Sequence, residues 1–369
     1  MLPYWFIFLF PAFFAFIGID RKLHSYNKFF ATKLDFMWWM VVILLTIIAG
    51  LRYEVGGDWF NYIRIFNQVE GLSLVSLATA GDPGYLFLNW LGKVSGSGIY
   101  GVNFLAGFLF SIGLAIFCRH LPRPFLGLTV AIPYLFVVVS MGYSRQGIAL
   151  GLSMLGLVAL IKKRNIRFVF WIILAATMHK SAIILLPLAA FTSTKNKFLV
   201  WTAIALSGLL ATFFLVLDSL NHLYTYYIKN PYVSDGAIIR LGMNAIPAAI
   251  YLIWSDRFNF SLEQRQIWGL FSIASIIFLC LFFITPASTA LDRIALYFLP
   301  IQLVILSYLP QTFSRSDASK KIILTGVIFY SGLVLFVWLN FANHSFYWIP
   351  YQNYIFINEN VLQIPKDGW

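Results

Sequence analysis

The chain has 369 residues, of which 60% are hydrophobic and only 11% are charged, and its mean hydropathy is +0.80. A soluble domain carries roughly 25% charged residues, so this composition excludes a water-soluble globule. The formal net charge is +12. In a membrane protein such an excess indicates either topology or an anionic ligand, and the positions of the basic residues decide between the two.

Apolar segments of about the length of a membrane span recur along the whole chain. No room for a soluble domain remains between them, so we expect an all-α polytopic fold with one integral membrane domain over 1–369 and about 10–12 transmembrane helices. The expected spans are 2–19, 36–50, 99–118, 124–141, 146–161, 198–217, 237–254, 266–285, 290–309 and 321–340. Two further stretches, 84–98 and 168–191, are harder to assign, and the first has an interfacial or re-entrant character.

The basic residues fix the expected orientation. If the first span runs from outside to inside, 17 of the 26 Lys and Arg residues lie in cytoplasmic connections, eight lie outside, and Lys180 lies within a hydrophobic stretch. The opposite orientation would place the larger set outside, against the positive-inside rule. The net charge is therefore mainly an orientation signal.

This orientation has a consequence for 168–191. The basic clusters at 162–167 and 195–197 are both assigned to the cytoplasm, so the 24 residues between them must cross the membrane an even number of times. They are too few for two full spans. We therefore expect a broken or re-entrant helix whose halves meet near 178–181, a form that is tolerated only beside protein or a water-filled cavity. The alternative is one kinked span.

The connection after the second span joins an arginine, a glycine pair and an aspartate. Arg52 offers a planar fork for phosphate or carboxylate, Gly57 lets the backbone approach a ligand closely, and Asp58 is suited to accept a proton from a sugar hydroxyl or to pair with Arg52. The alternative is a helix end with a solvated turn. The loops 51–83 and 218–236 are expected to contribute to a site on the outer side.

Two further polar groups occur at or within apolar segments. Arg145 and Gln146 stand at the start of the span 146–161, where helix amides favour an anion, although an arginine there also snorkels to water. His179, Lys180 and Ser181 interrupt an apolar stretch. Ionisable groups at that depth are usually functional, and a histidine is suited to general-base chemistry; backbone carbonyls are the alternative partners of His179.

The later outer connections contain two more arginines. Arg293 and Tyr297 are four residues apart and would share a helix face. The alternative for Asp292 is only to cap the helix and pair with Arg293. Arg240 follows the connection 218–236, which contains four tyrosines. These rings suit sugars, but they also suit an ordinary interfacial belt.

Together, the four outer arginines predict one cavity for a strongly anionic group such as a pyrophosphate. The chain contains no phosphate-loop, Asp-x-Asp or His-Glu-x-x-His motif, and its two cysteines are far apart, so no metal or cofactor is expected. Nucleic acid is not an expected partner because most basic residues are spread over short cytoplasmic turns.

The segment Arg52-x-x-x-Gly56-x-Asp58-x-x-x-Tyr62 resembles a motif of the EpsG-type and Wzy-type polymerases of bacterial polysaccharide and O-antigen synthesis. Gly57 and Trp59 depart from the pattern, because the family often has threonine or serine and tyrosine around the aspartate. Later blocks of this chain are similar to the family in order and spacing over about 50–300. They are Asp82-Pro83-Gly84-Tyr85, Arg145-Gln146, His179-x-Ser181 and Arg293 with Tyr297.

The resemblance implies a metal-independent, GT-C-like glycosyltransferase of the bacterial inner membrane, with its site on the periplasmic side. Such an enzyme moves a growing glycan from undecaprenyl pyrophosphate to the non-reducing-end hydroxyl of an undecaprenyl-pyrophosphate-linked repeat unit. Membrane lipid, a chain-length regulator and a flippase are the implied partners. The catalytic candidates are His179, Asp58, Arg145 and Arg293; the substrate-binding candidates are Arg52, Gly57, Tyr62, Gln146, Ser181, Arg240 and Tyr297.

Two other functions stay open at this point. A lipid-linked oligosaccharide flippase or transporter would also use arginines for pyrophosphate, but transporters usually show repeated halves and paired broken helices. An O-antigen ligase would use similar chemistry with a different acceptor. His179 and Asp58 both remain candidates for the general base.

Overall fold

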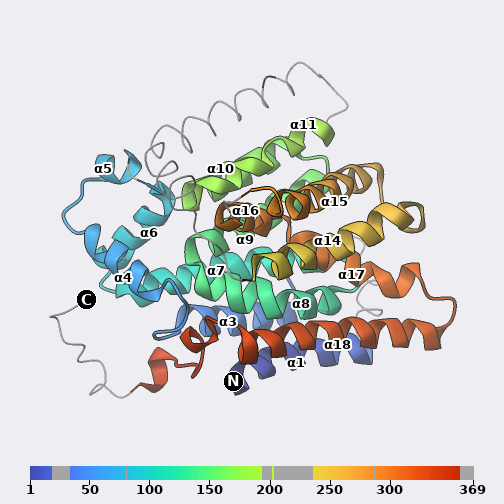
Figure 1. The fold of residues 1–369 in the computed structure, drawn as a ribbon. Helices are drawn as coiled ribbons and strands as arrows, with labels where there is room; N and C mark the ends of the chain where they lie inside the picture. The colour runs from blue at the N-terminus through green and yellow to red at the C-terminus, as the bar shows by residue number, and fades with distance from the viewer. Residues whose placement is uncertain (19–33, 80, 193–201, 203–235, 286–287, 358–369) are drawn as a thin grey trace.

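The computed structural model describes residues 1–18, 34–79, 81–192, 202, 236–285 and 288–357. Within these ranges all regular elements are helices, which lie side by side with their axes in broadly one direction (Figure 1). The all-α polytopic fold expected from the sequence is confirmed. The predicted span 198–217 and loop residues 218–235 lie outside the described residues.

The remaining predicted spans each coincide with a helix or a helix pair. Among the described residues, five stretches are long and apolar enough to cross a membrane, and a sixth is a pair bent by 47°. The long helices are α7 (Gly98–Arg119), α9 (Ser144–Ile161), α14 (Ala237–Trp254, extended by a 3₁₀ turn), α15 (Leu262–Phe282) and α18 (Asp317–Phe341). The bent pair joins α16 (Ser288–Ala295) and its 3₁₀ turn η6 (Leu296–Phe298) to α17 (Pro300–Thr312). Shorter apolar helices are α1 (Leu2–Ile17), α3 (Phe36–Gly50) and α8 (Pro124–Ala131), which continues as the π-helix η1 (Ile132–Ser140).

Helix α7 lies at the centre of the bundle, between α3 and α9. Small residues allow this close packing: a Cβ atom built on Gly113 of α7 would lie 2.1 Å from the carbonyl oxygen of Gly151 on α9. Without a hydrophobic driving force between helices in lipid, such close backbone approach is a main source of helix association. Helices α7 and α9 are therefore in close backbone contact at the centre of the bundle.

Three short helices gather at one end of the bundle (Figure 1). They are α4 (Trp59–Gln68), α5 (Leu74–Thr79) and α6 (Pro83–Val94). They connect the end of α3 to the start of α7, so the predicted orientation places them on the outer side. Helix α6 covers most of the stretch 84–98 and is amphipathic, with Tyr85 and Leu88 buried and Phe87 exposed.

The expected helix break is present. Helix α10 (Asn165–Met178) ends at His179, whose backbone is extended with φ −156° and ψ 114°. The chain continues as a 3₁₀ helix, η2 (Lys180–Leu185), and then as α11 (Leu188–Thr192). The break therefore places His179 at the junction of two helical segments, where its side chain leaves the regular helical spacing.

The segment after α18 folds back over the outer end. Trp348 is buried, and its indole N–H donates to the carbonyl oxygen of Val137 at 2.8 Å. Backbone amides of Tyr53 and Gly56 donate to the carbonyl oxygens of Gln352 and Tyr347, at 3.0 and 2.9 Å. These bonds hold the turn between α3 and α4, and with it the position at which α4 begins.

Candidate functional site

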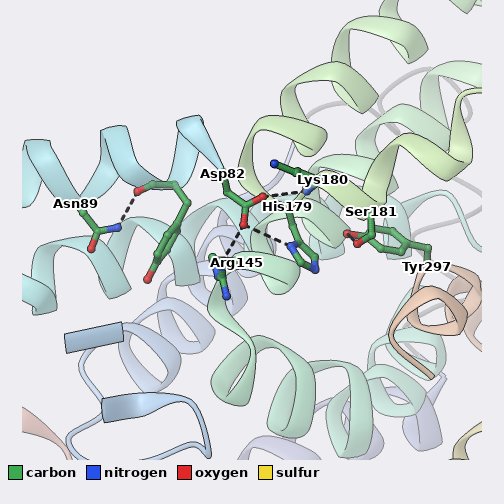
Figure 2. A network of polar contacts seen from close by, with 8 residues as sticks. Asp82, Asn89, Arg145, His179, Lys180, Ser181 and Tyr297 are labelled. Atoms are coloured by element: carbon green, nitrogen blue, oxygen red, sulfur yellow. Dashed lines mark hydrogen bonds and ion pairs between the residues drawn. The ribbon is translucent and has the colours of Figure 1, made fainter. Parts of the chain in front are cut away.

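The centre of the site is the carboxylate of Asp82, immediately before α6 (Figure 2). Its Oδ2 atom accepts a hydrogen bond from Nη1 of Arg145 at 2.9 Å and lies 3.6 Å from Nδ1 of His179. Its Oδ1 atom accepts from the backbone N–H of Lys180 at 3.1 Å. One carboxylate thus joins the start of α6, the start of α9 and the break after α10.

The charge state of Asp82 follows from these neighbours. Burial by itself would raise the pKa of Asp82, but His179, Arg145 and the Lys180 amide favour the carboxylate and together hold the pKa below its ordinary value. A buried carboxylate that accepts hydrogen bonds and faces cations stays ionised. Asp82 is therefore a fixed negative charge beside two cationic or basic side chains.

His179 is suited to act as a base through its second nitrogen. Its side chain is 19% exposed, and its Nδ1 atom faces Asp82. The separation of 3.6 Å is an electrostatic contact longer than a normal hydrogen bond. The carboxylate favours the tautomer with the proton on Nδ1, which leaves the lone pair on Nε2. This is the arrangement in which a carboxylate orients an imidazole for proton transfer.

Arg145 lies in the first turn of α9, and 27% of its side chain is exposed. It is next to Tyr62, a buried residue of α4 whose ring packs against Tyr85 with centroids 5.6 Å apart. Burial and the charge of Asp58 raise the pKa of Tyr62 to about 12, although Arg145 acts in the opposite direction. The Tyr62 hydroxyl therefore keeps its proton and stays neutral beside the guanidinium group of Arg145.

Asp58 stands at the start of α4 and faces the same group of residues. Burial raises the pKa of Asp58, and the charges of Arg293, Arg145 and His179 oppose this shift. The other three residues predicted to be catalytic therefore all lie within electrostatic range of Asp58. Gly57, beside Asp58, is exposed.

Arg293 and Tyr297 do not share a helix face, contrary to the expectation. Arg293 is exposed whereas Tyr297 is completely buried. The reason is that α16 ends at Ala295 and continues as a 3₁₀ turn, which has 3.0 residues per turn and so shifts the side-chain register. The carbonyl of Arg293 accepts from Nε2 of Gln146 at 2.6 Å, and the Tyr297 hydroxyl lies 3.2 Å from Oγ of Ser181.

Arg52 is placed in the interior, where its side chain is 1% exposed. Its guanidinium donates to the carbonyl oxygens of Val55 and Ala49 and to Oγ of Ser144, the last at 2.7 Å. Burial lowers the pKa of Arg52, and nearby tyrosines oppose the shift. These protein acceptors occupy the guanidinium, so Arg52 does not face a cavity as expected and instead ties α3 to α9.

Arg240 is also engaged with the protein. Its guanidinium forms a two-pronged ion pair with the carboxylate of Asp292, at 2.8 and 2.7 Å. Asp292 thus pairs with Arg240, in a contact that joins α14 and α16. The four outer arginines consequently differ in exposure: Arg52 and Arg240 are largely buried among protein acceptors, whereas Arg145, which Asp82 holds, is partly exposed and Arg293 is exposed.

Asp82 is the member of the site that the sequence analysis did not select. The signal was present, since Asp82 opens one of the short blocks that resemble the polymerase family. The sequence does not show that Asp82 pairs with Arg145, because the two residues are 63 positions apart. Among the described residues, no group of three or more His, Cys, Asp or Glu side chains is arranged to hold a metal ion.

Comparison with known proteins places this geometry in a family. Neither a curated protein nor a solved structure matches the chain. The model described as "EpsG family" matches residues 35–353, a range that includes every residue of the site. This membership suggests a polysaccharide-polymerase-like role for a membrane protein. Because the match covers most of its length, the chain belongs to the EpsG family.

Proposed function

We propose that the protein is a polysaccharide polymerase of the bacterial inner membrane, with its site on the periplasmic side. It transfers a growing glycan from undecaprenyl pyrophosphate to a hydroxyl at the non-reducing end of an incoming lipid-linked repeat unit, as in O-antigen and lipopolysaccharide assembly. Family membership supports the class of reaction. The contact of His179 and Arg145 with one buried carboxylate, Asp82, supports the assignment of the site.

The reaction is a glycosyl transfer. The acceptor oxygen forms a bond to the anomeric carbon of the donor sugar, and the bond from that carbon to the pyrophosphate oxygen breaks. His179 Nε2 takes the acceptor proton and later releases it to water. Undecaprenyl pyrophosphate leaves with the bonding electron pair. General-base assistance of this kind contributes about 10²–10⁴-fold to a rate.

The arginines stabilise the leaving group. Arg145 is held in one orientation by Asp82, and the exposed Arg293 stands nearby within electrostatic range of Asp58. Guanidinium groups that are oriented before the reaction stabilise negative charge as it develops, at little cost in reorganisation. Asp58 is the second candidate for the base, and its charge also orders the two arginines. Ser181, two residues after His179, offers a hydroxyl for a sugar, and the buried Tyr297 hydroxyl accepts from it and holds its orientation.

The test is reconstitution with one substrate. The purified full-length protein in lipid nanodiscs is given undecaprenyl-pyrophosphate-linked repeat units from its own host, and products are separated by size. A polymerase yields a ladder of lipid-linked oligomers together with free undecaprenyl pyrophosphate, and His179→Ala yields neither.

Cells lacking the protein should cap their acceptor with single repeat units. Loss of all glycan from the acceptor would instead indicate a ligase or a flippase, and would contradict the proposal.

A further inference from the structure

A groove lies between the far ends of α4 and α6, away from the catalytic cluster. Its volume is about 690 Å³, within the range typical of small-molecule sites. Phe66 and Glu70 contribute from the end of α4 and the turn after it, and Trp90 and Lys93 contribute from the last turns of α6. The groove therefore lies in the outer-end helices that also position Asp58 and Asp82.

The groove combines an apolar wall with exposed polar groups. Trp90 and Phe66 are half-buried, and both line the groove. Lys93 Nζ lies 2.6 Å from Oε2 of Glu70 and 5.0 Å from the centroid of the Phe66 ring. The side chain of Glu70 is 80% exposed, whereas that of Lys93 is 20% exposed. A charged pair is thus held against an aromatic ring at the edge of the groove.

This chemistry matches a carbohydrate. A sugar ring has an apolar face of C–H bonds that packs on an aromatic ring, and a rim of hydroxyls that donate to a carboxylate and accept from an ammonium group. The rim of the groove contains Gly71, Gly96 and Gly98, all with positive φ. Because glycine carries no side chain, these turns leave the rim low and open to a flat, extended ligand.

The position of the groove indicates which sugars it holds. Asp82 precedes the first residue of α6 and Lys93 lies in its last turn, so at 1.5 Å per residue the two are separated by roughly 16 Å along the helix. The helices α4 and α6 both begin at the catalytic cluster and both end at the groove. An oligosaccharide that extends from the reacting sugar along these helices reaches the groove.

We infer that the groove lined by Phe66, Glu70, Trp90 and Lys93 binds sugar residues of the growing glycan. This inference rests on the proposed polymerase function. The growing chain, unlike a single incoming unit, must extend well beyond the reacting sugars, and the groove lies one helix length away from them, at the far end of α6. Binding there keeps the chain on the enzyme between additions, so the groove controls how many units are added per encounter.

The test compares binding with chain length. The probes are soluble oligosaccharides of one, two and three repeats, released by mild acid from the host's own lipid carrier. We expect Trp90→Ala to weaken binding of the longer probes by about tenfold, which corresponds to about 1.4 kcal/mol, and Trp90→Phe to restore much of it. In the reconstituted reaction, Trp90→Ala should still form the first linkage but yield shorter polymers. Glu70→Gln should shorten them to a smaller extent.

A matched control is available on the neighbouring helix. Phe60 is 50% exposed on α4 and does not line the groove. Phe60→Ala should retain binding of the longer probes. Equal losses in Phe60→Ala and Trp90→Ala, or polymers of normal length from Trp90→Ala, would overturn the inference. Neither result would affect the proposed function, which fails only if the wild-type protein forms no linkage or if His179→Ala forms normal polymer.

Discussion

The Oδ2 atom of Asp82 lies 3.6 Å from the Nδ1 atom of His179, although the two residues belong to elements almost a hundred positions apart. The same oxygen accepts a hydrogen bond from Arg145. Asp82 therefore acts on two proposed catalytic side chains at once. Asp82 fixes the tautomer of His179, the proposed base, and the orientation of Arg145, the proposed cation for the leaving group. We therefore call Asp82 a positioning residue.

Three substitutions of Asp82 separate the effect of its charge on activity from the effect of its hydrogen bonds. Asp82→Asn keeps an acceptor for the Lys180 amide but removes the charge, and we expect turnover to fall by more than about tenfold with little change in KM. Asp82→Glu should recover part of the activity, whereas Asp82→Ala should be the weakest of the three. Initial rates of undecaprenyl pyrophosphate release measure this order. Equal activity in the Asn and Ala variants, or wild-type activity in both, would show that Asp82 does not orient the base.

Arg145 should be needed for chemistry and not for folding. Its side chain is partly exposed at the start of α9, and we expect Arg145→Ala to lower turnover by about 10²–10³-fold while the protein still inserts and folds. Its Tm should fall, because the buried Asp82 carboxylate loses its ion-pair partner. Arg145→Lys should rescue only part of the rate, because an ammonium group lacks the planar fork. Arg64→Ala, at an exposed arginine of α4, is the matched control. Normal polymer from Arg145→Ala would remove it from the site.

Arg52 should show the opposite behaviour. Its guanidinium is buried against the carbonyl oxygens of Ala49 and Val55 and the hydroxyl of Ser144, so Arg52→Ala leaves several acceptors without a donor. We expect the free energy of unfolding to fall by about 2–4 kcal/mol, seen as a lower Tm in detergent. Arg52→Lys should not restore it. A variant with unchanged Tm but no polymer would return Arg52 to the ligand site.

These contrasts show what the sequence can and cannot predict. Apolar length and the distribution of basic residues predict the spans and the helix break at His179, because both depend on local composition and on the membrane itself. The roles of Arg52 and Arg145 are indistinguishable in the sequence, since each follows or precedes an apolar helix. Their difference arises from tertiary neighbours, Ser144 for one and Asp82 for the other, and no local pattern encodes these pairings.

The pair formed by Arg240 and Asp292 lends itself to a double-mutant cycle. The two side chains are only 15% and 12% exposed, so removal of one partner leaves a poorly solvated charge. We expect Arg240→Ala and Asp292→Ala each to lower the Tm, and the double variant to be more stable than their sum predicts, with a coupling of roughly 0.5–3 kcal/mol. Thermal unfolding of the four proteins measures it. Additive effects, with loss of polymer only in Arg240→Ala, would instead indicate contact with substrate.

The two aspartates of the site should respond to pH in opposite ways. Burial raises the pKa of Asp58, so its ionised form destabilises the folded state, and this cost appears as the pH rises through the folded-state pKa. The neighbours of Asp82 hold its pKa below the ordinary value, so its carboxylate stabilises the folded state above the unfolded pKa of about 3.9. That contribution is lost as the pH falls through the folded-state pKa.

We therefore expect Asp58→Asn to raise the Tm at pH 7 and Asp82→Asn to lower it. Both differences should shrink toward zero on acidification, that of Asp58→Asn at a higher pH than that of Asp82→Asn. Shifts of the same sign at pH 7 would show that the charges around the two carboxylates do not differ in this way.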